Sequence, residues 1–433
     1  MIGFAGLSHL GVVSAIATAT KGFEVIAYGD DFALCDSLNH GKPPFFEPGL
    51  AEVLASNQSR IHFTSDPSEI GKCEVVYFSL DVPTDENGSS DLSTLTKLIE
   101  GIITFASDSA ILVVLSQVPP GFTRKLARRI GELQDGRNLQ LFYQVETLIF
   151  GRAVERALYP ERFIIGSHKP RAALPKAYAK LLSGFDCPIL VMRYESAELA
   201  KISINMCLVS SVSVANTMAE LCEKIGADWS EIVPALKLDK RIGPHAYLSP
   251  GLGIAGGNLE RDLATVVSLA NEVGTDDAIV DAWISNSHYR RDWALQMIHA
   301  EVISHSETPA IAIWGLAYKQ DTNSTKNSAA LSLIDALKPF SIRAYDPHVV
   351  LDVEIGPNFS QSASALEACT GVDAVAIMTP WPQFSSINMA EIKAAMKGRV
   401  VLDPYGVLDG NACAQAGLLY FKLGSPALGA SEK

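Results

Sequence analysis

The sequence has few charged residues, few cysteines and no long apolar run, and each shortage excludes a class of protein. Charged residues make up 19% of the 433 and hydrophobic residues 48%, which is typical of a folded chain rather than a disordered one. The 7 cysteines are scattered, with no CxxC pair and no metal-type spacing. We therefore expect reduced thiols and no bound metal.

Membrane and nucleic-acid partners are not expected either. No run approaches the roughly 18 apolar residues of a membrane span, and the N-terminus lacks the basic segment of a signal peptide. The net charge of −13 argues against a general nucleic-acid binder. The chain is too long for one small core. These features predict a cytoplasmic protein of two or three domains that binds neither membrane nor nucleic acid.

Apolar strands alternate with helices in two parts of the chain. The first part has strands at residues 2–5, 23–28, 74–80, 110–116 and 139–145, and the second, from residue 311, continues at 341–345, 374–378 and 400–403. Between them, residues 195–227 contain no glycine or proline until Gly226 and predict a long helix. The fold class is α/β, with two Rossmann-like doubly wound domains joined by a long central helix. The expected domains are 1–194, 195–298 and 299–433.

A glycine turn follows the first strand. It reads Gly6-Leu7-Ser8-His9-Leu10-Gly11 and leads into a helix of small apolar residues. Such turns let the backbone approach a pyrophosphate and present helix N-terminal amides to it. Ser8 replaces the middle glycine of the fingerprint, and glycines also serve packing alone in such turns. We predict that a dinucleotide contacts Gly6, Ser8, His9, Leu10 and Gly11.

The end of the second strand indicates which dinucleotide binds. Asp30 can accept hydrogen bonds from the adenosine ribose; alternatively, Asp30 and Asp31 only cap the next helix. Between Lys21 and Lys42 there is no Lys or Arg to pair with a 2′-phosphate. NAD is therefore predicted in preference to NADP.

Seven ordered motifs resemble those of the UDP-glucose and GDP-mannose dehydrogenases, the nucleotide-sugar 6-dehydrogenases. FSLDVPTDENGSSDL is similar to the family's IAVGTPTDEDGSADL, and GKPPFFEPGLAEVL to GKSPIYEPGLEELL. The other five are GRAVERALYPERFIIG, ELAKISINMCL, RIGPHAYLSPGLG, the glycine loop SPGLGIAGGNLERD and IWGLAYK. The resemblance covers nearly the whole chain and implies the two-Rossmann fold, a nicotinamide cofactor and a homodimer formed through the central helix.

The resemblance also implies catalytic residues. Lys201 and Asn205, one helical turn apart, match the pair that stabilises an alkoxide and orients water, and Asp262 with Glu146 would complete the acid–base set. Each has a plainer interpretation from its residue type. Lys201 could be a solvated helix lysine, and Glu146 a salt bridge at a strand end.

Several positions depart from the family pattern. Aligned on Asp262, the family's catalytic cysteine falls on Asn258, whose carboxamide cannot form a thiohemiacetal. Asn258 could also be only a turn residue. Gln117 replaces an active-site threonine, and Ile149 and Phe150 replace charged residues that help to hold nucleotide and sugar. Cys207 lies off the Lys201/Asn205 helix face and is interpreted as a packed thiol.

The remaining ligand positions also follow from the resemblance. The cofactor is expected to contact Pro83, Thr84 and Gln117 as well. The substrate-binding residues expected are Arg241, Tyr247, Gly251, Gly253, Gly256, Gly257 and Lys319.

Together these features predict an NAD-dependent oxidoreductase acting on an anionic small molecule. The reaction expected is a single two-electron alcohol/carbonyl interconversion on a UDP-sugar, since the thioester step needs the missing thiol. Three alternatives stay open: a small phosphorylated or phosphonate hydroxy compound as substrate, four-electron oxidation to a uronate through the aldehyde hydrate, and a non-catalytic paralogue that binds nucleotide-sugar or NAD.

Overall fold

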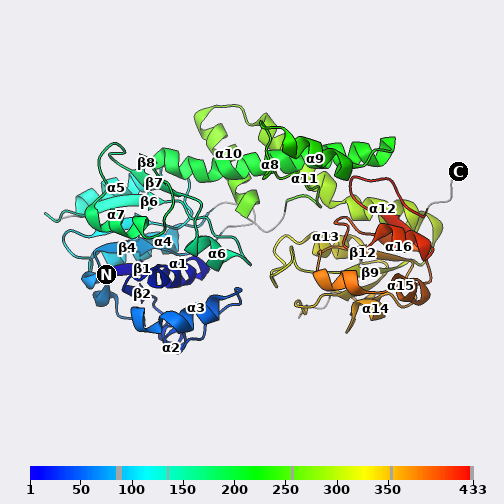
Figure 1. Ribbon diagram of the computed structural model, residues 1–433, viewed down its shortest axis with the longest axis horizontal. Coiled ribbons are helices and arrows are strands. Elements are labelled where there is room, and N and C mark those ends of the chain that lie inside the picture. Colours follow the sequence, from blue (N-terminus) through cyan, green and yellow to red (C-terminus); the bar gives the residue numbers. More distant parts are fainter. Residues whose placement is uncertain (84–89, 134–135, 255–257, 352–354, 430–433) are drawn as a thin grey trace. The chain divides into compact units, whose positions relative to one another are not determined.

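A computed structural model describes the chain except residues 84–89, 134–135, 255–257, 352–354 and 430–433. The chain divides into two compact units, Met1–Ile204 and Asn205–Lys433, each built around its own sheet (Figure 1). Helix α8 (Tyr194–Ile225) begins in the first unit and ends in the second. The α/β class with two Rossmann-like domains and a long helix is confirmed.

The first unit contains an eight-stranded sheet of order β3-β2-β1-β4-β5-β6-β7-β8. Only β6 and β7 pair antiparallel; the other neighbours are parallel. Its strands are β1 (Ile2–Ala5), β2 (Val25–Tyr28), β3 (Ile61–Thr64), β4 (Val75–Phe78), β5 (Ile111–Val114), β6 (Gln140–Gln144), β7 (Phe163–Ser167) and β8 (Ile189–Arg193). The strand order reverses between β1 and β4, so their carboxyl ends open the crevice where ligands bind in such sheets.

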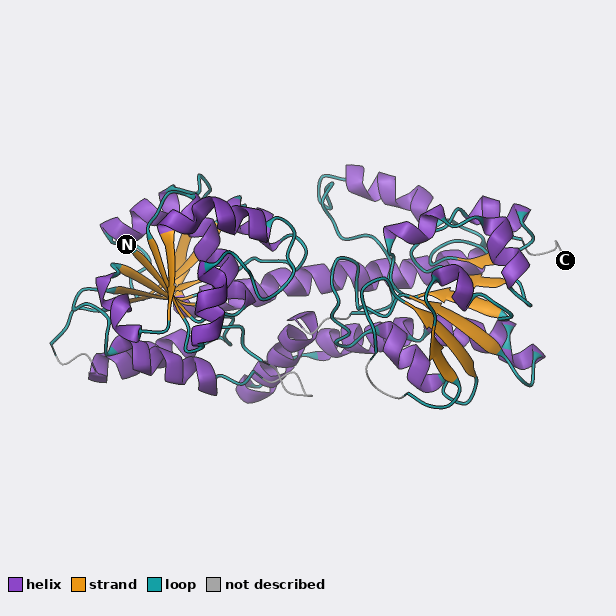
Figure 2. Cartoon of the chain, turned by 90° about the horizontal axis from the view of Figure 1, so that it is seen from below, coloured by secondary structure: helices purple, strands orange, loops and turns teal. Residues whose placement is uncertain are grey.

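Helices cover both faces of this sheet (Figure 2). They are α1 (His9–Thr20), α2 (Phe32–Asn39), α3 (Leu50–Asn57), α4 (Ser93–Ile103), α5 (Phe122–Leu133), α6 (Ala153–Leu158) and α7 (Lys176–Ser183), with 3-10 turns η1 (Gln58–Arg60) and η2 (Pro67–Lys72). Successive strand residues enter different cores: Phe4 and Tyr77 pack on one face, Ala5 and Phe78 on the other. The central strands β1, β4 and β5 are apolar throughout because both of their faces are buried.

The second unit contains a six-stranded parallel sheet of order β11-β10-β9-β12-β13-β14. Its strands are β9 (Ala310–Trp314), β10 (Ser341–Tyr345), β11 (Phe359–Gln361), β12 (Ala374–Ile377), β13 (Val400–Leu402) and β14 (Leu419–Phe421). Its helices are α9 (Trp229–Leu238), α10 (Asn258–Val273), α11 (Ala278–Arg291), α12 (Trp293–Glu301), α13 (Ala329–Ala336), α14 (Ala365–Ala368), α15 (Met389–Ala395) and α16 (Gly410–Gln415), with 3-10 turns η3 (Ile303–His305) and η4 (Pro382–Ser386).

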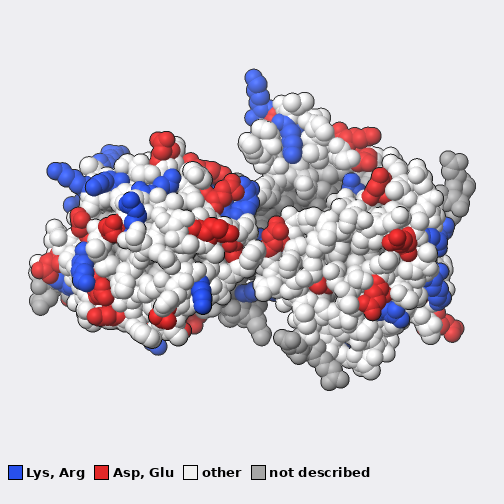
Figure 3. Space-filling model, turned by 60° about the horizontal axis from the view of Figure 1, so that its bottom comes forward, with Lys and Arg blue, Asp and Glu red and all other residues white. Residues whose placement is uncertain are grey.

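Helix α8 is long and apolar enough to meet the length and composition of a membrane span. Its most apolar 18-residue window has a mean hydropathy of 1.4, and 39% of that window is buried within the protein. Core helices of soluble proteins reach the same values. Charged side chains of both signs are interspersed on the face shown in Figure 3, most of which is uncharged.

Candidate functional site

The turn after β1 is shaped by two glycines. Gly6 has φ +105°, and a Cβ on it would meet the Leu80 side chain at 2.7 Å. A Cβ on Gly11 would lie 1.8 Å from the Gly6 carbonyl oxygen, so only glycine lets α1 begin this close to the turn. Ser8 has a role of its own: its hydroxyl donates to Ser79 O (3.1 Å) and accepts from Asp81 N (2.8 Å). The serine thereby joins the carboxyl ends of β1 and β4.

A pocket of about 580 Å³ opens beside this turn. Its walls include Gly6, Ser8, Asp30 and Lys97. Asp31 accepts from the amides of Ala33 and Leu34 and so caps α2, whereas Asp30 is the N′ residue before that cap. The capping interpretation therefore applies to Asp31, and Asp30 is left facing the pocket. The pocket thus joins the glycine turn after β1 to the acidic end of β2.

Leu7 explains why the acidic residue stands at position 30. A Cβ on Gly29 would lie 2.8 Å from Leu7 Cδ1, so a larger side chain at 29 would collide with the turn. Burial raises the pKa of Tyr28, and the neighbouring Asp30 carboxylate adds to that rise. The acidic group after β2 therefore stands at position 30, because position 29 has no room for a side chain.

His9, another predicted cofactor residue, contacts a buried carboxylate and two aromatic rings. His9 Nε2 lies 3.1 Å from Glu47 Oε2, and the imidazole packs between the rings of Phe45 and Phe150, with centroids 4.8 and 4.4 Å away. Glu47, which sequence reasoning missed, also accepts from the amides of Gly151 and Ala153. Phe150 thus contacts the predicted dinucleotide loop directly.

Gln117 and Pro83 lie in the loops after β5 and β4, and Thr84 lies outside the described residues. Both loops therefore start at the carboxyl edge of the sheet, where the crevice opens.

Lys201 and Glu146 form an ion pair. Lys201 Nζ lies 2.8 Å from Glu146 Oε1, and the two side chains are 15% and 13% exposed. Glu146 Oε2 also accepts from Leu148 N at 3.0 Å. Lys201 is therefore not a solvated lysine, and the salt bridge considered for Glu146 exists, with Lys201 as its partner. The pair fixes an ammonium group at the carboxyl edge of the first sheet.

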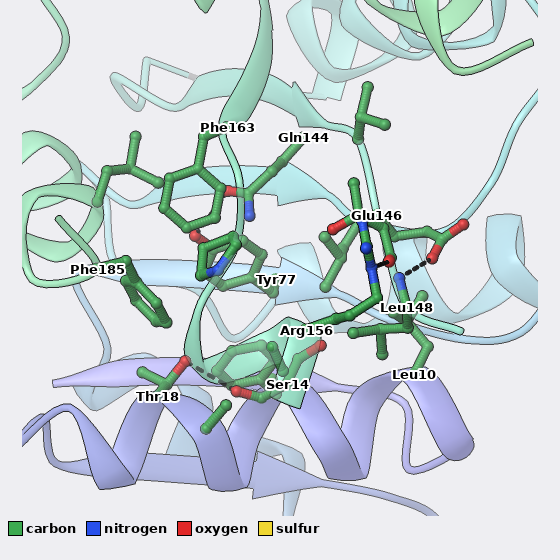
Figure 4. A pocket seen from close by; sticks show the side chains of 18 of the residues that line it. Leu10, Ser14, Thr18, Tyr77, Gln144, Glu146, Leu148, Arg156, Phe163 and Phe185 are labelled. Carbon is green, nitrogen blue, oxygen red and sulfur yellow. Dashed lines mark hydrogen bonds between the residues drawn. The ribbon is translucent and has the colours of Figure 1, made fainter. Parts of the chain in front are cut away.

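A small cavity of about 60 Å³ lies behind Glu146 (Figure 4). Gln144 Oε1 accepts there from the hydroxyls of Tyr77 (3.0 Å) and Tyr178 (2.9 Å). Burial raises the pKa of both phenols, which remain neutral donors. Arg156 Nε donates to Thr147 O at 2.7 Å. The cavity has room for a few water molecules beside polar groups.

Glu198 is a buried carboxylate that sequence reasoning also missed. It lies on α8 one turn before Lys201 and accepts from Gly121 N (2.6 Å) and Thr123 N (2.8 Å). These amides belong to the start of α5, so Glu198 caps that helix from another element. Burial raises its pKa, although the two amides oppose the rise. The sequence did contain a pointer to this residue, since Glu198 is the first residue of the motif ELAKISIN.

In the second unit, Asn205 Nδ2 donates to Asp262 Oδ2 at 2.6 Å. Asn205 is 8% exposed and Asp262 2% exposed. The structure thus brings together two predicted catalytic residues from α8 and α10.

Asn258 is the first residue of α10 and is exposed. Its Oδ1 accepts from the guanidinium of Arg261 at 3.2 Å. The structure therefore has a neutral amide, oriented by an arginine, at the start of α10.

The predicted substrate residues of the second unit differ in exposure. Arg241, with a side chain 89% exposed, pairs with Asp239 at 2.7 Å, and Tyr247 is 53% exposed. Gly251 N donates to Asn216 Oδ1 at 2.8 Å. A Cβ on Gly253 would lie 2.3 Å from Ser287 O. Gly256 and Gly257 lie outside the described residues.

Lys319 follows the glycine turn after β9, and its ammonium lies 5.6 Å from the Tyr318 ring centroid. Buried Asp346 accepts from the amides of Leu316 (2.6 Å) and Ala317 (3.1 Å) in this turn, and from Trp381 Nε1 at 3.1 Å. Sequence reasoning missed Asp346, which orders the loop that carries Lys319.

One cysteine prediction is wrong. Cys207 was expected to be packed, yet its side chain is exposed on α8, since an off-site helix face is not by that fact a buried one. Among the described residues, no three His, Cys, Asp or Glu side chains group as metal ligands.

Three segments of the chain match the three domains of one family, the UDP-glucose/GDP-mannose dehydrogenases. Residues 1–185 match its NAD-binding domain, residues 195–288 its central domain and residues 312–410 its UDP-binding domain.

Among curated proteins, the UDP-glucose 6-dehydrogenase of Bacillus subtilis is 27% identical, covering 99% of this chain and 94% of that protein. That of Rickettsia typhi is 29% identical, covering 98% and 99%. Among solved structures, a UDP-glucose dehydrogenase of Pyrobaculum islandicum superposes with a TM-score of 0.84 at 27% identity, covering 94% of each chain.

Proposed function

Since the chain belongs to the UDP-glucose/GDP-mannose dehydrogenase family and is an NAD-dependent dehydrogenase acting on CH–OH groups, we propose that it performs a single two-electron interconversion of alcohol and carbonyl. One observation carries this proposal. The residue at the start of α10 is Asn258, held by Arg261, and an amide cannot capture an aldehyde as a thiohemiacetal.

The single step needs only groups that this chain has. Bound NAD supplies the hydride acceptor. As the C–H hydride leaves the alcohol carbon, the hydroxyl proton passes to a carboxylate, and the products are a carbonyl, NADH and that proton. Asp262 is the base in this proposal. Asn205, which donates to it at 2.6 Å, orients that carboxylate.

Lys201 stabilises the developing alkoxide in this proposal. An ammonium group that is already fixed by Glu146 at 2.8 Å needs little reorganisation when charge develops. Lys201 and Asn205 are one turn apart on α8, so their side chains leave the same face of that helix.

The substrate that we propose is a UDP-sugar, which is supported by the match of residues 312–410 to a UDP-binding domain. A smaller phosphorylated or phosphonate alcohol is the second candidate. It is favoured by Ile149 and Phe150, apolar side chains that are 40% and 45% exposed where the family motif has charged residues.

The test measures how many NADH molecules form for each substrate molecule consumed. The purified protein is incubated with NAD and UDP-sugars or small phospho- and phosphono-alcohols, and NADH absorbance is compared with product mass. One NADH and a carbonyl product per substrate support the proposal; two NADH and a carboxylate contradict it. Ligand binding in a thermal-shift assay without any NADH signal would indicate a non-catalytic paralogue.

The variant Asn258→Cys sharpens this test. It returns a thiol to the start of α10, so we expect a second NADH and a carboxylate product to appear. Asn286→Cys is a matched control, because it places a thiol on α11 of the same unit.

We also propose that the protein is a cytoplasmic homodimer. Val214, Met218, Leu221 and Ile225 recur at intervals of four and three residues along α8 and are 54%, 40%, 48% and 74% exposed. Such a stripe is the pattern of a helix that packs on another helix. Light scattering after chromatography should give a dimer mass for the wild type and a monomer mass for Met218→Glu. A wild-type monomer would contradict the proposal.

A further inference from the structure

A carboxylate stands at the N-terminus of α1, where the dinucleotide turn offers its amides. Leu10 N, in the first turn of α1, lies 3.4 Å from Asp81 Oδ2. The main chain of Asp81 is held in place by Ser8, whose hydroxyl accepts from Asp81 N at 2.8 Å. Two adjacent loops thus bring an acidic side chain to the mouth of the turn.

This carboxylate replaces a cap that α1 otherwise lacks. The Ser8 side chain makes no capping bond to α1, and the first turn of the helix contains no acidic residue of its own. Ser8 is instead occupied with Ser79 and Asp81, the start of the loop after β4. Asp81 is exposed, and the ion pairs found among the described residues do not include it.

The same amides are those that a dinucleotide needs. In a sheet of this order, the pyrophosphate binds at the first helix N-terminus because the amides there are unpaired and the helix dipole is positive. The pocket beside the turn includes Gly6, Ser8 and Asp30 among its walls, so adenosine bound there would place the pyrophosphate at this N-terminus. A bound pyrophosphate and the Asp81 carboxylate would therefore be two anions competing for one donor group.

We propose that Asp81 sets a weak affinity for NAD by competing with its pyrophosphate at the N-terminus of α1. The related family motif quoted above has glycine at this position, so the competition is a property of this chain. The residue acts only on ligands that carry phosphate. Adenosine itself, which occupies the neighbouring pocket, is unaffected. A weaker affinity would speed the release of the reduced or oxidised cofactor.

The expected change in ADP-ribose affinity follows from the repulsion between the Asp81 carboxylate and the pyrophosphate. Two like charges a few ångströms apart at the rim of a protein repel enough to change a binding constant by about tenfold, or about 1.4 kcal/mol. Salt screens this repulsion, because the Debye length falls from about 30 Å at 0.01 M to about 8 Å at 0.15 M ionic strength. The effect of Asp81 should therefore be largest at low ionic strength.

The experiment is calorimetric titration of the full-length protein with ADP-ribose and with adenosine. Asp81→Asn and Asp81→Gly are compared with Glu24→Gln, which removes the same charge from an exposed position at the amino-terminal end of β2, on the opposite edge of the sheet. We expect both Asp81 variants to bind ADP-ribose about tenfold more tightly, with adenosine affinity unchanged and the gain reduced at high salt. Glu24→Gln should alter neither affinity.

Two results would overturn the proposal. ADP-ribose affinity that stays equal or falls in both Asp81 variants means that the carboxylate is not a competitor. An equal gain for adenosine means that the substitution reshapes the pocket rather than removing a charge. Because binding is measured without turnover, either result leaves the two-electron proposal untouched.

Discussion

The substitution Glu198→Ala tests whether the buried carboxylate holds the first unit together next to Lys201. In the wild type, Glu198 is fully buried and accepts from Gly121 N at 2.6 Å and Thr123 N at 2.8 Å. Alanine leaves both amides at the start of α5 without their acceptor. The cap of that helix is lost, together with the link between α8 and the loop that carries Gln117.

The expected loss of stability follows from the two hydrogen bonds that Glu198 accepts. A buried amide left without a partner costs about 1–3 kcal/mol. The cost of burying the carboxylate, which disappears with the side chain, offsets part of this. We therefore expect a net loss of about 2–4 kcal/mol, which for a unit of this size lowers its thermal midpoint by about 5–10 °C.

The assay is thermal unfolding of the full chain, with Glu195→Ala as the control. Glu195 lies one turn earlier on the same helix and pairs with Arg124 at 2.8 Å, but its side chain is 44% exposed. Exposed ion pairs contribute about 0–1 kcal/mol, so this variant should unfold close to the wild type. The reasoning is refuted if Glu198→Ala is no less stable than Glu195→Ala.

The pH dependence gives a second check. Burial raises the pKa of Glu198 above its ordinary 4.5, so the folded chain binds this proton more tightly than the unfolded chain. Its contribution to stability is then greatest below the ordinary pKa and declines as the pH rises through the raised value. The stability difference between wild type and Glu198→Ala should therefore narrow from pH 4.5 towards pH 8. A stability difference that widens as the pH rises would show that the two α5 amides lower the pKa of Glu198 by more than burial raises it.

Two further pairs of substitutions test the ligand sites. Lys201→Met should lower kcat about 10²–10⁴-fold without changing the affinity for ADP-ribose. The control Lys125→Met, at an exposed position on α5, should leave kcat unchanged. Equal losses of kcat in the two variants would contradict a catalytic role for Lys201. Asp30→Asn should weaken adenosine binding in calorimetry, because Asp30 lines the pocket. Asp31→Asn should chiefly lower the free energy of unfolding, by about 0.5–2 kcal/mol, because Asp31 caps α2. Weaker adenosine binding in Asp31→Asn and lower stability in Asp30→Asn would contradict this assignment.

The sequence by itself determined the fold and the positions of most elements. The strand at 2–5 has the expected bounds, and the long helix ends within two residues of its expected limits, because apolar runs and the absence of glycine and proline are local properties. The resemblance supplied Lys201, Asn205, Glu146 and Asp262. It could not show how their side chains pair.

Only the tertiary structure decided which distant groups each charged side chain contacts. Glu198 and Thr123 are 75 positions apart, and Asp81 and Leu10 are 71 apart. A hydrophobic period reports which face of an element is buried, but not which distant loop lies against it. Such pairings arise where parallel strands bring loops from separate parts of the chain to one edge of a sheet. That geometry gave Asp81 its place at α1 and Lys201 its partner, Glu146.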